Sequence, residues 1–291
     1  MALTNPGITM AVHALFANIK PALDLIEALG PTDFSAEEPG VDVKPGTTVK
    51  YPLSVVSAAL AFDDDTNNYL TGGDTAWGSL TATHFLQGYD LRGTNIDAGV
   101  NAGRIKQLFT SRAGTGIGMA AVGSIKTALD GTTESTSVKL PASPTLAQYD
   151  GLASAKDWFD AANATLVLNG SEWAKVKGVM HSAHLSATPQ AVAEELGFRK
   201  VVYVPGLTAR ALIVPYSSMG FIARVPAIVA KYISAGTVTE PDTGLQIGVV
   251  VADDQAHNRI VANADLWFGC VALSANAGAT TKGIIKVGTA A

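Results

Sequence analysis

The pattern of hydrophobic and polar positions predicts that roughly the first 46 residues form a helix and an arm, with few apolar side chains to pack together. Apolar residues at helical spacing over Thr9–Leu29 predict a short helix that is interrupted at Pro21 and ends at Gly30 and Pro31. Residues Phe34–Gly46 are acidic and punctuated by Pro and Gly, which is typical of an extended arm. Neither segment carries enough apolar residues for a core of its own.

A long hairpin is predicted next, going out along Thr47–Phe62, passing a polar tip at Asp63–Asp74 and returning through Leu80–Ile96. A single strand over the outward leg would extend about 50 Å at about 3.3 Å per residue, far beyond the usual strand. Such a hairpin must be covered, either by folding back on a core that this chain barely supplies or by neighbouring copies of the chain. The second option favours an assembly subunit over an enzyme.

The period then becomes helical over Asp97–Leu129, with a weak point at Gly114, Gly116 and Gly118. The pattern predicts one long, bent helix or two helices in series. Residues Gly131–Pro144 are polar and are predicted to form a connector.

A compact α/β segment follows, in which Asn169–Gly170–Ser171 is predicted to form a turn into the N-cap of a helix that begins near Ser171. Its other predicted elements are helices over Thr145–Ala162 and Pro189–Leu196 and strands over Ala164–Leu168, Lys200–Val204 and Ala211–Val214. The last third predicts a second long hairpin, with strands Gly244–Ala252 and Arg259–Leu273 and a polar tip at Asp253–Asn258.

Composition adds to the picture of a surface that contacts other subunits. Only 15% of the residues are charged, 47% are hydrophobic, and 29 are Gly. Small, neutral surfaces of this kind are often buried between subunits. The net charge of -5 comes without a cluster of Lys and Arg, so the sequence offers no site for tight, specific binding of nucleic acid, although weak contact with packaged nucleic acid stays open.

The single cysteine, Cys270, excludes a disulfide framework within the chain and suits a reducing compartment. Its apolar neighbours favour a buried, inert thiol. The first residues lack the pattern of a secretion signal, and no run of 18 apolar residues occurs, so we expect synthesis and assembly in the cytoplasm.

Motifs for chemistry are few. Asp63, Asp65, Asn67 and Asp74 fall at positions 1, 3, 5 and 12 of an EF-hand-like loop, but the sixth position lacks Gly and a strand precedes the loop, so a solvated turn is the default. His181 and His184 could share a helix face, yet no acidic or cysteine partner lies nearby in sequence to complete a zinc site.

The order of the predicted elements resembles the tailed-bacteriophage major capsid proteins of the Hong Kong 97-type fold over nearly the whole chain. Val43–Val49 resembles the lead-in to the family's extended E-loop, and Ala164–Trp173 resembles the strand, turn and helix of its axial domain. Pro241–Gly269 resembles the family's peripheral-domain hairpin.

The resemblance implies an α+β fold with six parts. In chain order they are an N-terminal arm (1–40), an extended E-loop hairpin (41–96), a peripheral domain with a long spine helix (97–144), an axial α/β domain (145–238), a peripheral-domain hairpin (239–273) and a C-terminal segment that returns to the axial domain (274–291).

The function that the resemblance implies is that of a structural major capsid protein. Copies would self-assemble into pentamers and hexamers of an icosahedral shell around phage double-stranded DNA in the virion, with no catalytic residue, cofactor or metal. Implied partners are other copies, a portal, a separate scaffold, decoration proteins and, by weak contact, the packaged DNA; no membrane is involved. The residues implied at contacts between subunits are Asp63, Asp65, Asn67, Tyr69, Asp74, Trp77, Asp253, Asp254, His257 and Asn258.

Two departures from the family pattern shape these expectations. Some members weld their shells through a lysine on the long loop, but the tip over Asp63–Trp77 has none and Lys50 lies near the hairpin's base, so we expect non-covalent contacts only. Some members also carry a cleaved N-terminal scaffolding region, whereas the arm here begins almost at Met1, so we expect a separate scaffold or none.

Two other functions stay open at the level of sequence. An encapsulin-like compartment shell would share the fold and enclose a cargo enzyme in place of a genome. A soluble α/β enzyme or ligand-binding protein would need pocket residues that converge only in space.

Overall fold

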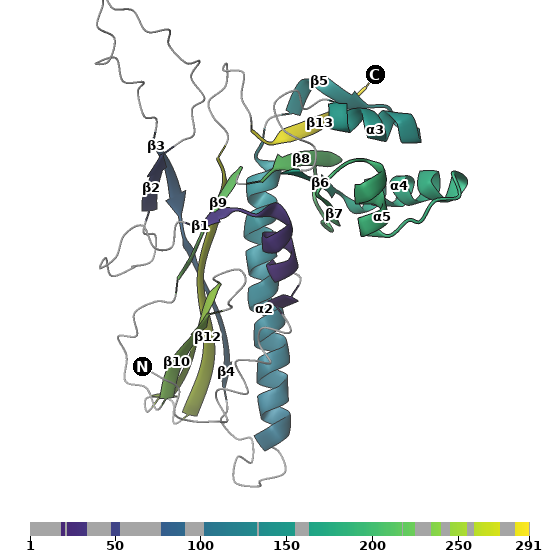
Figure 1. Cartoon of the computed structure of the whole chain (residues 1–291). Helices are drawn as coiled ribbons and strands as arrows, with labels where there is room; N and C mark the ends of the chain where they lie inside the picture. Colours follow the sequence, from purple (N-terminus) through teal and green to yellow (C-terminus); the bar gives the residue numbers. More distant parts are fainter. Residues whose placement is uncertain are drawn as a thin grey trace, which may run out of the picture. The chain divides into compact units, whose positions relative to one another are not determined.

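The computed structural model shows an α+β protein (Figure 1). The residues that it describes are 19–20, 22–33, 48–52, 77–90, 102–132, 134–154, 163–216, 218–224, 234–239, 245–254, 259–273 and 283–290. They belong to two compact units. Unit 1 comprises Met1–Val49, Thr81–Ala128 and Gly220–Val271, and unit 2 comprises Lys50–Leu80, Leu129–Met219 and Ala272–Ala291.

The N-terminal helix of unit 1 ends where the sequence predicts. Residues 19–20 and 22–29 are helical, and Gly30 follows with a φ of 54°. The Gly30 N–H donates to the carbonyl of Ile26 at 2.9 Å, which satisfies one of the carbonyls left open at a helix end. The left-handed conformation explains why glycine stands there.

A six-stranded sheet dominates unit 1. Its order is β1 (Thr32–Asp33), β9 (Met219–Arg224), β12 (Arg259–Ala272), β11 (Gln246–Asp254) and β10 (Ser234–Thr239), with β4 (Thr83–Asp90) paired to β12. β11 and β12 are antiparallel, which confirms the predicted second hairpin. Trp267 and Phe268 on β12 are buried, and the Phe268 ring lies 6.2 Å from that of Phe221.

The first predicted hairpin is only partly confirmed. β2 (Thr48–Pro52) pairs with β3 (Trp77–Thr81) in a two-stranded sheet, and residues 53–76 lie outside the described part of the chain. The return leg is not one strand, because β3 gives way at Ala82 to β4, which pairs antiparallel with β12. The later half of that leg therefore packs within the chain's own sheet, which is the first of the two ways of covering the hairpin that the sequence left open.

Gly269 marks a close approach between β12 and the junction of β3 and β4. A Cβ at this position would lie 2.5 Å from the carbonyl oxygen of Thr81 and 3.1 Å from the Cα of Ala82. We expect Gly269→Ala to lower the free energy of unfolding by about 1–3 kcal/mol, because backbone atoms must shift to admit the methyl group. Thermal unfolding of the unassembled protein measures the change.

Gly123 supplies the matched control for this substitution. It lies in a helix of the same unit, and a Cβ there would meet nothing within 4 Å. Gly123→Ala should therefore raise stability by about 0.5–1 kcal/mol through helix propensity. Equal effects of the two substitutions would contradict the close approach at Gly269.

One continuous helix, α2 (Ala102–Asp130), has 29 residues and runs through all three glycines of the predicted weak point. This decides between the two alternatives that the sequence left open. Ile117, Ala121, Ile125 and Leu129 recur every fourth residue and are at most 1% exposed, so they form a buried apolar face of the helix.

Unit 2 is built on a five-stranded sheet with the order β5 (Glu134–Leu140), β13 (Ile285–Thr289), β8 (Ala211–Pro215), β6 (Ala164–Leu168) and β7 (Lys200–Tyr203). β6 and β8 are buried along their whole length. β6 continues through α4 (Gly170–Ser182) and α5 (Pro189–Glu195) into β7, which is parallel to β6. α3 (Leu146–Ser154) confirms the first part of the predicted helix, and residues 155–162 lie outside the description.

The prediction of a connector over Gly131–Pro144 is wrong, because residues Glu134–Leu140 form the edge strand β5. The serines and threonines of this segment are typical of a loop. In the strand, however, Val138 and Leu140 lie on the same face and pack in or against the apolar core of unit 2. The strand is completed by parallel pairing with β13 at the other end of the sequence. A local pattern does not contain such a distant partner.

Candidate functional site

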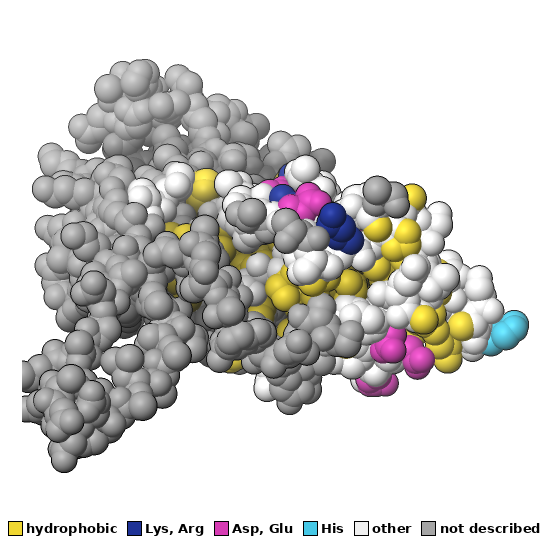
Figure 2. Space-filling view, turned by 90° about the horizontal axis from the view of Figure 1, so that it is seen from above, with side chains coloured by type: hydrophobic (Ala, Val, Ile, Leu, Met, Phe, Trp, Pro, Cys, Tyr) yellow, Lys and Arg dark blue, Asp and Glu magenta, His cyan; other side chains and the backbone are white. Residues whose placement is uncertain are grey.

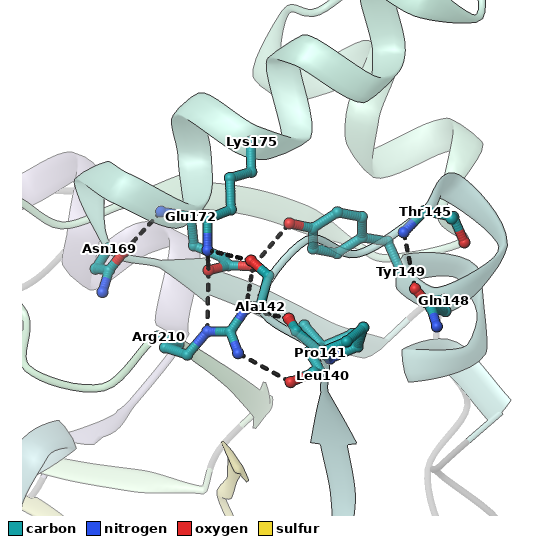
Figure 3. A network of polar contacts seen from close by, with 10 residues as sticks. All are labelled: Leu140, Pro141, Ala142, Thr145, Gln148, Tyr149, Asn169, Glu172, Lys175 and Arg210. Carbon is teal, nitrogen blue, oxygen red and sulfur yellow. Dashed lines mark hydrogen bonds and ion pairs between the residues drawn. The ribbon is translucent and has the colours of Figure 1, made fainter. Parts of the chain in front are cut away.

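A buried carboxylate, Glu172, joins four parts of unit 2 (Figure 3). It lies in the first turn of α4, where Asn169 is the N-cap and its side chain accepts a hydrogen bond from the Glu172 N–H at 2.8 Å. This confirms the predicted cap. The Glu172 side chain is 1% exposed, so its charge must be balanced by neighbouring groups.

Three side chains donate to the two carboxylate oxygens. Arg210, which precedes β8, donates from Nη2 to Oε1 at 2.9 Å and from Nε to Oε2 at 3.0 Å. The Tyr149 hydroxyl on α3 donates to Oε1 at 2.7 Å, and Lys175 Nζ donates to Oε2 at 3.2 Å. The contact between Arg210 and Glu172 is bidentate, which is the geometry that guanidinium and carboxylate groups favour.

The same cations also hold the segment that leads from β5 into α3. Arg210 donates to the carbonyls of Leu140 and Pro141, each at 2.9 Å, and Lys175 donates to the carbonyl of Ala142 at 2.8 Å. β5, α3, α4 and the start of β8 therefore meet at one cluster. We call Glu172, Arg210, Tyr149 and Lys175 the Glu172 cluster.

Electrostatics in the cluster favour an ionised Glu172 beside a neutral Tyr149. Desolvation alone would raise the pKa of the Glu172 carboxyl, but the hydrogen bonds from Arg210, Tyr149 and Lys175 and the charge of Arg210 outweigh it and hold the pKa below its usual value. Desolvation, followed by the hydrogen bond to Glu172, raises the pKa of the Tyr149 hydroxyl far above its ordinary value.

The Glu172 cluster is a structural joint. Both carboxylate oxygens of Glu172 already accept bonds, so the group is held by the fold and not presented to a substrate. One local signal points to Glu172: it lies three residues after Asn169, which is the spacing of a capping box. Its partner Arg210 is 38 positions away, a separation that no local pattern bridges.

The residues predicted at contacts between subunits are not brought together in the described structure. Asp63, Asp65, Asn67, Tyr69 and Asp74 at the first tip, and His257 and Asn258 at the second, lie outside the described residues. Trp77 begins β3.

The placement of Asp253 and Asp254 in the second tip is wrong, because both residues belong to β11. They pair with Ile260 and Arg259 of β12, so the hairpin continues farther than the polar sequence indicated. Cross-strand pairing satisfies the backbone there, whatever the polarity of the side chains.

No group of three or more His, Cys, Asp or Glu residues among the described ones could hold a metal ion. His181 and His184 are both exposed, and Figure 2 shows histidine at one extremity of the described surface. Cys270 is partly buried, and desolvation raises the pKa of its thiol to about 12, so it is a poor nucleophile. Within the described residues, no helix is both long and apolar enough to cross a membrane.

Comparison with known proteins gives likenesses of structure and none of sequence. No protein-family model matches the chain, and no curated protein matches it. The solved structures that resemble it include the capsid of Ralstonia phage GP4, with a TM-score of 0.49 at 11% identity, covering 89% of each chain.

Two further solved structures resemble this chain over a similar share of its length. The capsid of a native GTA particle has a TM-score of 0.49 at 11% identity, covering 90% of this chain and 95% of that one. A virus-like particle from Pyrococcus furiosus has a TM-score of 0.45 at 10% identity, covering 90% of this chain and 92% of that one. No residue role follows from likenesses at this level.

Proposed function

We propose that this chain is a structural shell subunit, a major capsid protein of the Hong Kong 97-type fold from a tailed bacteriophage. Copies assemble into pentamers and hexamers of an icosahedral shell that encloses double-stranded DNA. The contacts between copies are non-covalent, and the protein is not an enzyme.

The observation that carries the proposal is the two-stranded sheet of β2 and β3. No third strand joins this pair among the described residues, whereas the other two sheets have five and six strands. A two-stranded ribbon alone is marginally stable in water and needs another surface to cover it. In a shell, a neighbouring copy provides that surface, and the apolar area covered there stabilises the assembly at about 25 cal/mol per Å², less the cost of association.

The order of the elements supports the same proposal. A helix of 29 residues follows the hairpin, a compact α/β unit follows that helix, and the chain then returns to the first sheet through β11 and β12. We propose that the chain divides into an arm (1–40), an E-loop hairpin (41–96), a peripheral domain (97–144 and 239–273) and an axial domain (145–238), with 274–291 returning to the axial domain. Within this division we assign β5 to the axial domain, because it pairs with β13, and β9 and β10 to the peripheral domain, because they pair with β12 and β11.

The contact residues and partners are part of the proposal. The residues from Asp63 to Trp77 of the first hairpin would lie against one neighbouring copy. The end of the second hairpin, from Asp253 to Asn258, would meet its counterparts near threefold-type contacts. A portal, a separate scaffold and decoration proteins would join the shell, and the packaged DNA would touch it weakly. The shell would be assembled in the cytoplasm of the host.

Size-exclusion chromatography with negative-stain electron microscopy tests the proposal. The purified protein should form closed shells or capsomers over a range of concentration, salt and pH, with its scaffold supplied if one exists. Shells that hold a protein cargo in place of DNA, when isolated from the native source, would indicate a compartment shell. A stable monomer under every condition would contradict any shell function.

A further inference from the structure

A pocket of about 430 Å³ opens beside the edge strand β7 of unit 2. Its wall combines α5 with the start of β7 and carries four apolar side chains and two cations. The side chains used in the argument are Gln190, Glu194, Phe198, Arg199 and Lys200. The size and the mixed lining suit one docked polar side chain or a short loop.

Arg199 is the unusual residue of this wall. Its guanidinium stacks on the Tyr216 ring, with Cζ 4.4 Å from the ring centroid, and Tyr216 itself is 54% exposed. The Nη1 atom of Arg199 is buried and has no hydrogen-bond partner among the residues that the structure describes. Glu194, the acid on the same wall, instead accepts a hydrogen bond from Gln190 at 2.9 Å.

Burial of the Nη1 atom without a hydrogen-bond partner is costly, and a negative charge in the pocket would offset that cost by its attraction to the guanidinium. A carboxylate is the group that a stacked arginine recognises best in proteins. This chain is itself acidic, with 25 Asp and Glu against 20 Lys and Arg. A second copy therefore offers suitable groups.

The sheet order indicates which carboxylate of a second copy would arrive. β7 and β5 are the two edges of the five-stranded sheet, with α5 packed on β7 and α3 packed on β5 (Figure 1). In a ring of copies related by rotation, one flank of each copy meets the opposite flank of the next. On the α3 flank, Asp150 is exposed, so its carboxylate is available to a neighbouring copy.

We propose that the Arg199 pocket receives the Asp150 carboxylate of the adjacent copy within a capsomer. This pairing rests on the proposed shell function and assigns a specific contact to it. Each copy contributes Arg199 on one flank and Asp150 on the other, so the contact closes only in a ring. The pocket alone is half of the site.

A charge-swap experiment on the full chain tests the pairing. We expect Arg199→Glu and Asp150→Arg each to lower the assembled fraction about tenfold at a concentration where the unchanged protein is mostly assembled. The double variant Arg199→Glu with Asp150→Arg should recover most of the assembly. Sedimentation velocity gives the assembled fraction, and thermal unfolding checks that each variant is folded.

Glu195→Arg is the matched control for Asp150→Arg, because both replace a carboxylate with a guanidinium. Glu195 is an exposed residue of α5 that lies outside the pocket wall. It should assemble like the unchanged protein. If Arg199→Glu does not fold, Asp150→Arg still decides, because it alters an exposed helix position. Normal assembly of Asp150→Arg, or no recovery in a folded double variant, would overturn the pairing, whereas failure of the unchanged protein to assemble would overturn the shell function itself.

Discussion

A Glu172→Ala variant should lose about 3–5 kcal/mol of unfolding free energy, a large share of the about 5–15 kcal/mol that stabilises a typical domain. The substitution leaves the Arg210 guanidinium, which is partly buried, without the carboxylate that accepts two of its bonds. It also leaves the Tyr149 hydroxyl without an acceptor. Urea unfolding followed by far-ultraviolet circular dichroism measures the loss.

Glu194→Ala is the control for this prediction. Glu194 is an exposed carboxylate on α5 whose contact is with Gln190, four residues away on the same helix. Its removal should change the unfolding free energy by no more than about 0.5 kcal/mol. Similar losses in the two variants would show that the Glu172 cluster does not hold unit 2 together.

The pH dependence of stability follows from the same pKa directions. Because the folded state lowers the pKa of Glu172, its stabilisation is present above the unfolded carboxyl pKa of about 4.3 and is lost as pH falls through the lower folded value. A Glu172→Gln variant should therefore lose less stability on acidification than the unchanged protein. For Tyr149 the pKa is raised, so its contribution is present below about pH 10 and is lost as the pH rises further.

The second large effect concerns assembly. Deleting residues 63–74 should prevent shells from forming, because the predicted hairpin would no longer reach across a neighbouring copy. The five-stranded sheet of unit 2 should stay folded, because its described core is formed by side chains of that sheet and of the helices α3, α4 and α5. Electron microscopy measures the shells, and thermal unfolding measures the unit.

The deletion both shortens the hairpin and removes the tip side chains. A variant in which residues 63–74 are replaced by Gly and Ser at equal length removes the side chains alone. If the tip side chains make the contact, this variant should also fail to assemble. Shells formed by the deletion variant would contradict the role of the hairpin, and unfolding of unit 2 would show that the segment belongs to a core within the chain.

Elements whose signals are local could be predicted from the sequence. The Asn169 cap, the helix end at Gly30 and the β6 strand depend on neighbours within a few residues, and the structure confirms each. The strand β5 could not be predicted from its polar composition, because its stability comes from β13 at the far end of the chain.

The Glu172 cluster also combines a local part with distant parts. The spacing of Asn169 and Glu172 could be recognised in the sequence, but Arg210 and Tyr149 come from other elements and could not be predicted as their partners. The Arg199 pocket likewise joins an aromatic residue after β8 to a cation before β7. The tip residues 63–74 and 255–258 stay predictions, because they lie outside the described residues.

Cross-linking of mixed-isotope shells tests most directly whether a second copy covers the first hairpin. Shells would be assembled from equal amounts of unlabelled and 15N-labelled protein and treated with an amine-reactive cross-linker, which can report on Lys50 in β2. Cross-links from Lys50 should join labelled to unlabelled peptides about as often as the random mixture allows. Cross-links from Lys50 that join only peptides of the same label would contradict the account.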